Sequence, residues 1–251
     1  MRLYSDKYIV LIFLIITLLI TPVYSQNIDE LIENIYQQTL SHEAKLDSLR
    51  NYSFVQKIHF TKMDGDEEIE EESIREFLVR VRSRENRHRE LISAMDLEGG
   101  QWVDVSEKEK NKRQTEGRGV KFSLTEIVSP EERKNYEFNL IGHDNIDSLH
   151  TIHLMVKPLE EDEDRFAGDL WFEKDTFSLV QAKLMPSEFP AAVENMRMDF
   201  LMREIGGMWM PVEVKFEAEV SFLIFFKGRI LSDILFEEYH FEQAFPDSLF
   251  Q

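Results

Sequence analysis

The chain has 251 residues, with 48 Asp and Glu against 29 Lys and Arg, so its formal net charge is −19 at pH 7. A protein this acidic is repelled by phosphate backbones, which excludes nucleic acid as an expected partner. No cysteine is present, so disulfides and a lipid-modified cysteine are excluded, and the core alone must stabilise the fold.

The first 25 residues have the layout of a secretory signal peptide. Arg2 and Lys7 precede an apolar stretch over 9–20, and Val23 and Ser25 occupy the −3 and −1 positions of a cleavage site. The stretch is shorter than the roughly 20 residues that cross a bilayer, which favours cleavage over a permanent anchor. We therefore predict a periplasmic protein with a single domain over 26–251. Removing the leader (two basic residues and Asp6, net +1) changes the charge from −19 to −20.

The first half of the mature chain is predicted to form one helix and then several strands. Apolar residues at helical spacing predict an amphipathic helix over 28–49, capped by Asn27 or Asp29. The segment 63–66, Met-Asp-Gly-Asp, is typical of a hairpin, and Gly99-Gly100 is typical of a turn. Strands are expected over 52–60, 77–81 and 90–95.

A charged segment separates the two halves. Residues 104–119 contain almost no apolar side chain, so we expect a mobile loop there. The following residues 120–128 form either a strand or a helix, and 129–132, Ser-Pro-Glu-Glu, is typical of a helix start.

The second half shows the two-residue alternation of strands that have one apolar and one charged face. The clearest case runs from Met210 to Val220, where apolar residues alternate with Pro211 and with charged residues. Turns are expected at 142–147 and 158–164, and a small flap over 186–193. Strands are expected over 136–140, 152–156, 166–173, 177–184, 195–203, 208–226 and 230–241.

One helix followed by about ten strands with short connections predicts a mainly β (α+β) fold with a largely antiparallel sheet. A sheet of that size tends to curl. We therefore expect an incomplete barrel, covered by the N-terminal helix and by small helical flaps.

The apolar strand faces are either ordinary core or the wall of a ligand cavity. Methionine and phenylalanine make adaptable walls, whereas β-branched residues pack rigidly. The candidate cavity residues are Phe54, Ile58, Phe166, Leu170, Phe172, Met196, Met198, Phe200, Met202, Met210, Val212, Val214 and Phe216.

Three arginines share one face of the strand that ends near residue 84. Arg80, Arg82 and Arg84 could contact anionic lipid headgroups or an acidic partner. Alternatively, they pair with the acidic run 67–72, which the hairpin at 63–66 would bring onto the neighbouring strand.

Catalytic and metal-binding motifs are absent from the sequence. There is no Gly-x-Ser-x-Gly elbow, no His-Glu-x-x-His pair and no glycine loop for phosphate. His150 and His153 are three residues apart, which places them on opposite faces of a strand. We expect no catalytic residue, no metal site and no cofactor.

The stretch from Tyr136 to the C-terminus resembles the LolA-like superfamily of periplasmic lipoprotein carriers. The matching motifs are Tyr-Glu-Phe-Asn-Leu-Ile-Gly over 136–142, Ile-His-Leu-Met-Val-Lys-Pro over 152–158 and Arg-Phe-Ala-Gly-Asp-Leu-Trp-Phe-Glu-Lys-Asp-Thr-Phe over 165–177. Two more follow, Gly-Met-Trp-Met-Pro over 207–211 and Glu-Glu-Tyr over 237–239. The resemblance implies an incomplete barrel, closed by helices, around a cavity for acyl chains. The matched motifs are structural, so no lipid-contacting residue is transferred, and the charged segment 104–119 departs from the compact carriers.

The sequence therefore predicts a monomeric periplasmic carrier that holds the acyl chains of lipoproteins or other lipids during transfer towards the outer membrane. Its expected partners are lipidated protein or lipid, with a membrane-bound donor or acceptor. One alternative is a sensory module on the same scaffold, which binds lipid or lipoprotein without transport. Another is an exported hydrolase, which the missing motifs disfavour.

Overall fold

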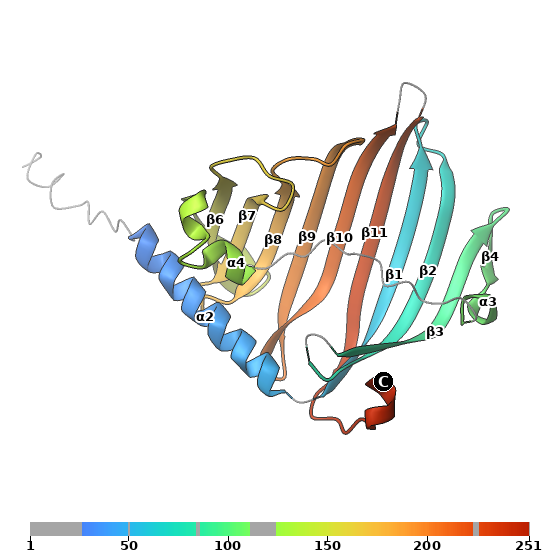
Figure 1. The fold of residues 1–251 in the computed structure, drawn as a ribbon, viewed down its shortest axis with the longest axis horizontal. Coiled ribbons are helices and arrows are strands. Elements are labelled where there is room, and N and C mark those ends of the chain that lie inside the picture. The colour runs from blue at the N-terminus through green and yellow to red at the C-terminus, as the bar shows by residue number, and fades with distance from the viewer. Residues whose placement is uncertain (1–26, 50, 84–85, 111–123, 223–225, 251) are drawn as a thin grey trace, which may run out of the picture.

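Eleven strands form one open antiparallel sheet in the computed structural model, which describes residues 27–49, 51–83, 86–110, 124–222 and 226–250 (Figure 1). The order is β4-β3-β2-β1-β11-β10-β9-β8-β7-β6-β5, so the chain builds one side of the sheet, crosses to the far edge, and returns to pair β11 with β1. The predicted fold class is confirmed, as a sheet that does not close into a barrel. The predicted signal peptide lies outside the described residues.

Every strand pair is antiparallel, and most strands are joined by short connections. The strands are β1 (Tyr52–Asp64), β2 (Ile69–Val81), β3 (Arg87–Glu98), β4 (Gln101–Asp104), β5 (Tyr136–Ile146), β6 (Leu149–Pro158), β7 (Phe166–Glu173), β8 (Leu179–Pro186), β9 (Val193–Ile205), β10 (Met208–Phe222) and β11 (Phe226–His240). The helices are α2 (Ile28–Ser48), α3 (Ser106–Lys110) and α4 (Leu124–Val128), with 3-10 turns η1 (Arg133–Asn135) and η2 (Asp247–Phe250).

Helix α2 lies close to its predicted range and covers one end of the sheet (Figure 1). Of the two predicted caps, Asn27 is the one observed: its side chain accepts a hydrogen bond from the backbone N–H of Asp29 at 3.2 Å. The buried face of α2 consists of Leu31, Ile32 and Ile35. No helix in the described part of the chain is both long and apolar enough to span a bilayer.

Two hydrophobic clusters lie on the sheet face that carries α2, here called the inner face. The first joins the buried residues of α2 to inner residues of β6–β9, including Leu154, Leu170 and Ala182. The second joins Phe54 of β1 to inner residues of β2 and β3 and to Val105, which precedes α3. Each cluster lies toward a different edge of the sheet, and β10, β11 and parts of β9 and β1 run between them (Figure 1).

The predicted mobile loop over 104–119 was wrong in its first part, where α3 forms. Asp104 accepts a hydrogen bond from the backbone N–H of Ser106 at 2.8 Å. Hydrogen bonding to the side chain and backbone of Ser106 lowers the pKa of the Asp104 carboxyl. The Ser106 hydroxyl accepts a hydrogen bond from the backbone N–H of Ala94 at 2.9 Å, which ties α3 to β3. Residues 111–123 lie outside the described chain.

Three turn positions also differ from prediction. Strand β5 continues through Gly142 (φ +157°), which follows a bulge at Ile141, and the chain reverses after Ile146. After Val128 the chain enters turns and the short η1 instead of a longer helix. The last hairpin pairs Phe222 with Phe226, so the strand predicted to end at 226 ends at 222.

Candidate lipid-binding face

Four predicted cavity residues lie beneath α2, where the protein's own side chains fill the space. Phe166, Leu170, Phe172 and Met198 are between 0% and 5% exposed and belong to the cluster that includes Leu31, Ile32 and Ile35. Because protein interiors are close-packed, truncating any of these side chains would leave a void in a closed interior. In this structure these four residues are core.

Phe54 is also buried, toward the other edge of the sheet. Its ring centroid lies 5.3 Å from that of Tyr239 and 5.7 Å from that of Phe236, and it packs with Phe77 and Val79 of β2. Tyr239 donates a hydrogen bond to the carbonyl oxygen of Pro211 at 2.7 Å, and burial raises its pKa above the ordinary tyrosine value. This aromatic group packs on the sheet near the C-terminal end of β11.

Between the two clusters, apolar inner-face residues remain partly exposed. Ile58, Ile234, Val214 and Phe200 lie directly opposite one another across β1, β11, β10 and β9. Adjacent strands are about 4.8 Å apart, so this surface is about 14 Å wide. The surface, here called the central apolar strip, consists of Ile58, Phe60, Met196, Phe200, Val214, Phe216, Ile230, Ile234 and Phe236.

The strip contains five of the predicted cavity residues, namely Ile58, Met196, Phe200, Val214 and Phe216. Four others were missed: Phe60, Ile230, Ile234 and Phe236. Those on β11 were hard to find because Leu231 and Leu235 make both faces of that strand apolar in sequence. The pairing of Ile234 with Ile58 and Val214 is what identifies the inner face of β11.

A bulge in β10 lies at the end of the strip, next to the remaining three predicted residues. The β9–β10 register shifts between Pro211 and Glu213, so Val212 is the extra residue. Met202 lies opposite Pro211, whereas Met210 lies opposite Arg203 and is 3% exposed. Because Arg203 and Phe200 are three residues apart, they point to opposite faces. Simple alternation predicted that Met210 and Val214 share one continuous face. Because of the bulge, they do not.

Beyond Ile58, the inner face changes from apolar to charged. Arg75 lies opposite Ile58 in β2, where its guanidinium donates to Asp96 at 2.6 Å and to the carbonyl oxygen of Met95 at 2.8 Å. Glu109 of α3 lies 3.8 Å from the same guanidinium. This partly buried ionic group marks one border of the strip.

Two of the three predicted headgroup arginines have protein partners. Arg80 pairs with Glu90 at 2.7 Å, and Arg82 pairs with Asp247 at 2.9 Å and lies over the Phe250 ring. Arg84 lies outside the described residues. The predicted pairing of Arg80 and Arg82 with residues 67–72 was wrong, because 67–72 precede or begin the same strand, β2. Within this acidic run, Glu70 pairs with Lys62 and Glu72 with His59.

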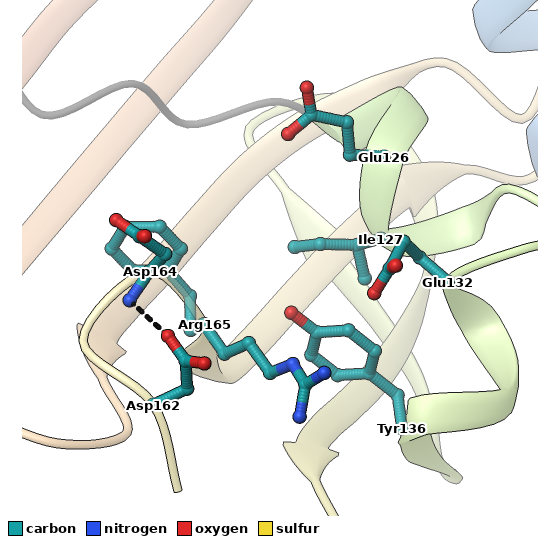
Figure 2. A pocket seen from close by; sticks show the side chains of 8 residues that line it. Glu126, Ile127, Glu132, Tyr136, Asp162, Asp164 and Arg165 are labelled. Atoms are coloured by element: carbon teal, nitrogen blue, oxygen red, sulfur yellow. Dashed lines mark hydrogen bonds between the residues drawn. The ribbon is translucent and has the colours of Figure 1, made fainter.

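A small polar pocket of about 280 Å³ lies between α4, η1 and the start of β7 (Figure 2). Figure 2 shows the Arg165 side chain extending toward Tyr136, with Asp162 and Glu132 nearby. Burial raises the pKa of Tyr136, although nearby Arg165 opposes the shift. A second pocket of about 330 Å³ lies where the start of α2 faces η1 and is lined in part by Ile28, Arg133 and Phe138. No strip residue lines either pocket.

The histidines have separate partners. His153 places Nε2 2.7 Å from Asp169 and Nδ1 3.3 Å from Asp144, and its ring stacks on Trp171 with centroids 4.3 Å apart. His150 contacts Asn145 at 2.6 Å. Within the described residues, no group of three or more His, Cys, Asp and Glu side chains has a geometry that could hold a metal ion.

Comparison with known proteins gives similarities in fold. No family model matches the chain, and no curated protein matches it. A LolA superfamily protein from Nitrosomonas europaea is 14% identical with a TM-score of 0.37, covering 85% of this chain and 97% of its own. A putative outer membrane lipoprotein-sorting protein domain from Vibrio parahaemolyticus is 10% identical with a TM-score of 0.46, covering 87% and 97%. The lipoprotein LppX from Mycobacterium tuberculosis is 10% identical with a TM-score of 0.26, covering 86% and 97%.

The sequence motifs predicted a resemblance to lipoprotein-sorting proteins, and such proteins are among these solved structures. All three TM-scores are below 0.5, so nothing about the function of this chain rests on them.

Proposed function

We propose that this protein is an exported binding protein for acyl-chain lipids or lipidated proteins, and that the central apolar strip holds the chains. The observation that carries the proposal is the partial exposure of large apolar side chains across four adjacent strands. A contiguous apolar surface that remains partly exposed is characteristic of binding sites. The signal-peptide layout of residues 1–25 supports a periplasmic location.

The energetics favour a flexible apolar ligand. Each methylene that leaves water gains about 0.8 kcal/mol, so several on the strip would offset the cost of immobilising a chain. Met196, Phe200 and Phe216 supply adaptable side chains at one side of the strip. Phe200 and Phe216 pack against the core beneath α2, and binding on the strip requires no movement of the fully buried residues of that core. This differs from the cavity under the helix that the sequence predicted.

A binding assay tests this function. Mature protein is titrated with a fluorescent fatty acid, and Ile234→Asn is compared with Leu235→Asn. Both variants change a partly exposed aliphatic residue of β11, but only Ile234 lies on the inner face. We expect about a tenfold loss of affinity for Ile234→Asn, since about 1.4 kcal/mol of apolar contact is lost, and little change for Leu235→Asn. Equal effects, or no uptake by the unaltered protein, would contradict the proposal.

The proposed role in transfer towards the outer membrane needs a second assay. Protein loaded with the fluorescent chain is mixed with acceptor vesicles, and chain transfer is followed by the change in emission. A carrier gives a transfer rate that rises with protein concentration. A protein that retains the chain in the presence of vesicles would favour the sensory alternative.

A further inference from the structure

Arg89 of β3 lies on the inner face, beside the cluster that borders the strip. It is directly opposite Val79 of β2, and Val79 is opposite Phe54 of β1. Its guanidinium carbon lies 3.6 Å from the centroid of the Phe77 ring. The guanidinium therefore covers one face of a buried aromatic ring, in a cation–π contact.

The guanidinium lacks the carboxylate partner that other arginines of this region have. Arg75, Arg80 and Arg82 each pair with an acidic side chain, whereas no carboxylate among the described residues pairs with Arg89. Partial desolvation of the guanidinium against the Phe77 ring lowers the pKa of Arg89, although the residue as a whole is solvent-exposed. An arginine keeps its charge under such conditions, so its edge donors remain available for an oxyanion.

Arg87 provides a second cation on the same side of β3. It lies opposite Val81, which is 3% exposed, just as Arg89 lies opposite the buried Val79. Residues two apart on a strand share a face, so both arginines lie on the inner face of β3. The Arg87 side chain is exposed, and none of the described carboxylates pairs with it.

The distance from these arginines to the strip suits an amphiphile. Phe77 lies opposite Gln56, and Gln56 lies opposite Phe236, which belongs to the strip. At about 4.8 Å per strand, β3 is about 10 Å from β1 and 14 Å from β11. A long acyl chain can span that separation along the inner face.

We propose that Arg89, with Arg87 beside it, binds the anionic head of an amphiphile whose acyl chain lies on the central apolar strip. The inference rests on the proposed function and adds the chemistry of the ligand: a carboxylate or phosphate attached to a long chain. A protein of net charge −19 repels anions in general, so binding such a head requires a local cation. The flat guanidinium presents paired donors that match the paired oxygens of either group.

The test compares ligands that share a chain but differ in charge. Mature protein is titrated with laurate, lauryl phosphate and the neutral ester monolaurin, using displacement of a fluorescent fatty acid. We expect Arg89→Gln to weaken laurate and lauryl phosphate about tenfold and to leave monolaurin within twofold. A phosphate ligand is favoured if lauryl phosphate loses more than laurate. The matched control Lys57→Gln removes the same charge from the outer face of β1 and should change none of the three.

The outcomes separate this inference from the proposed function. If Arg89→Gln weakens all three ligands equally, or none, the assignment of the head site is overturned while chain binding stands. If the unaltered protein binds none of them, the proposed function itself fails. Should Arg89→Gln prove unfolded by circular dichroism, the salt dependence of the unaltered protein decides. Added salt should then weaken laurate and spare monolaurin, and equal weakening would overturn the inference.

Discussion

One row of side chains runs through both the closed and the open part of the inner face. Leu154, Leu170 and Ala182 lie opposite one another in β6, β7 and β8, and the row continues through Phe200, Val214, Ile234 and Ile58. The first three are at most 1% exposed, and the last four are partly exposed. The strands do not differ in polarity along this row.

The cover over the row differs. Leu31, Ile32 and Ile35 of α2 pack on the closed part, whereas Val214 and Ile234 belong to neither hydrophobic cluster. The same type of side chain is therefore core in one place and accessible surface in another, depending on where a helix lies. The contrast predicts that mutations in the closed part act on stability, and that mutations in the open part act on binding.

The largest expected effect comes from Gly168, in the closed part. A Cβ at this position would lie 2.0 Å from the carbonyl oxygen of Lys183, in a backbone with φ +145°. The β7 and β8 backbones would have to separate, so we expect Gly168→Ala to cost more than about 3 kcal/mol of unfolding free energy in urea. Gly142→Ala is the control, because the added Cβ meets nothing within 4 Å; a similar loss there would contradict this reason.

A pair of truncations tests the contrast directly. Leu170→Ala should lower the free energy of unfolding by about 3 kcal/mol, because it leaves a cavity in a packed interior. Ile234→Ala should cost about 1 kcal/mol, because the side chain is partly solvated already. Urea denaturation with no ligand present measures both. Equal costs would mean that the strip is as much a part of the core as the residues beneath α2.

The locally determined parts of this fold could be predicted from sequence. Asn27 and the spacing of Leu31, Ile32 and Ile35 predict helix α2, and Asp64-Gly65 predicts the first hairpin. The apolar alternation of β7 and β9 gave strand ranges within about two residues of those observed. Each of these signals lies within a few residues of the element that it specifies.

The candidate site could be predicted only in part, because it depends on contacts between distant segments. Whether Phe200 or Leu170 is covered depends on where α2 packs, and alternation carries no information about that. The bulge at Val212 follows from pairing with β9 and not from the run of apolar residues itself. The role of Arg89 becomes visible only when Arg80 and Arg82 have been assigned to Glu90 and Asp247.

A smaller effect is expected at high pH, from the buried Tyr136 and the partly buried Tyr239. Burial raises the pKa of Tyr239, near the open part, and also that of Tyr136, near the closed part. An unfolded tyrosine loses its proton near pH 10, whereas the buried phenols keep theirs. The stability that they contribute is therefore complete below about pH 10 and is lost as pH rises further.

Tyrosine-to-phenylalanine variants measure this dependence. Tyr239→Phe should cost about 1 kcal/mol at neutral pH, because the hydrogen bond to Pro211 is lost. It should also reduce the decline in unfolding free energy above pH 10, and more than Tyr136→Phe does, since the Tyr239 pKa is raised further. An unchanged decline in both variants would show that other groups dominate.

The smallest effect is expected on the outer face, directly behind the strip. Arg197 of β9 pairs with Glu217 of β10 at 2.8 Å, and Glu217 also accepts a hydrogen bond from Arg229 of β11 at 2.8 Å. Arg197 is more than half exposed, so Arg197→Gln should change the free energy of unfolding by less than about 0.5 kcal/mol. It should also leave fatty-acid affinity unchanged, although Met196 and Met198, its neighbours in sequence, point to the inner face. A loss of affinity comparable to that of Ile234→Asn would mean that acyl chains do not distinguish the two faces, and the contrast between strip and core would then no longer explain binding.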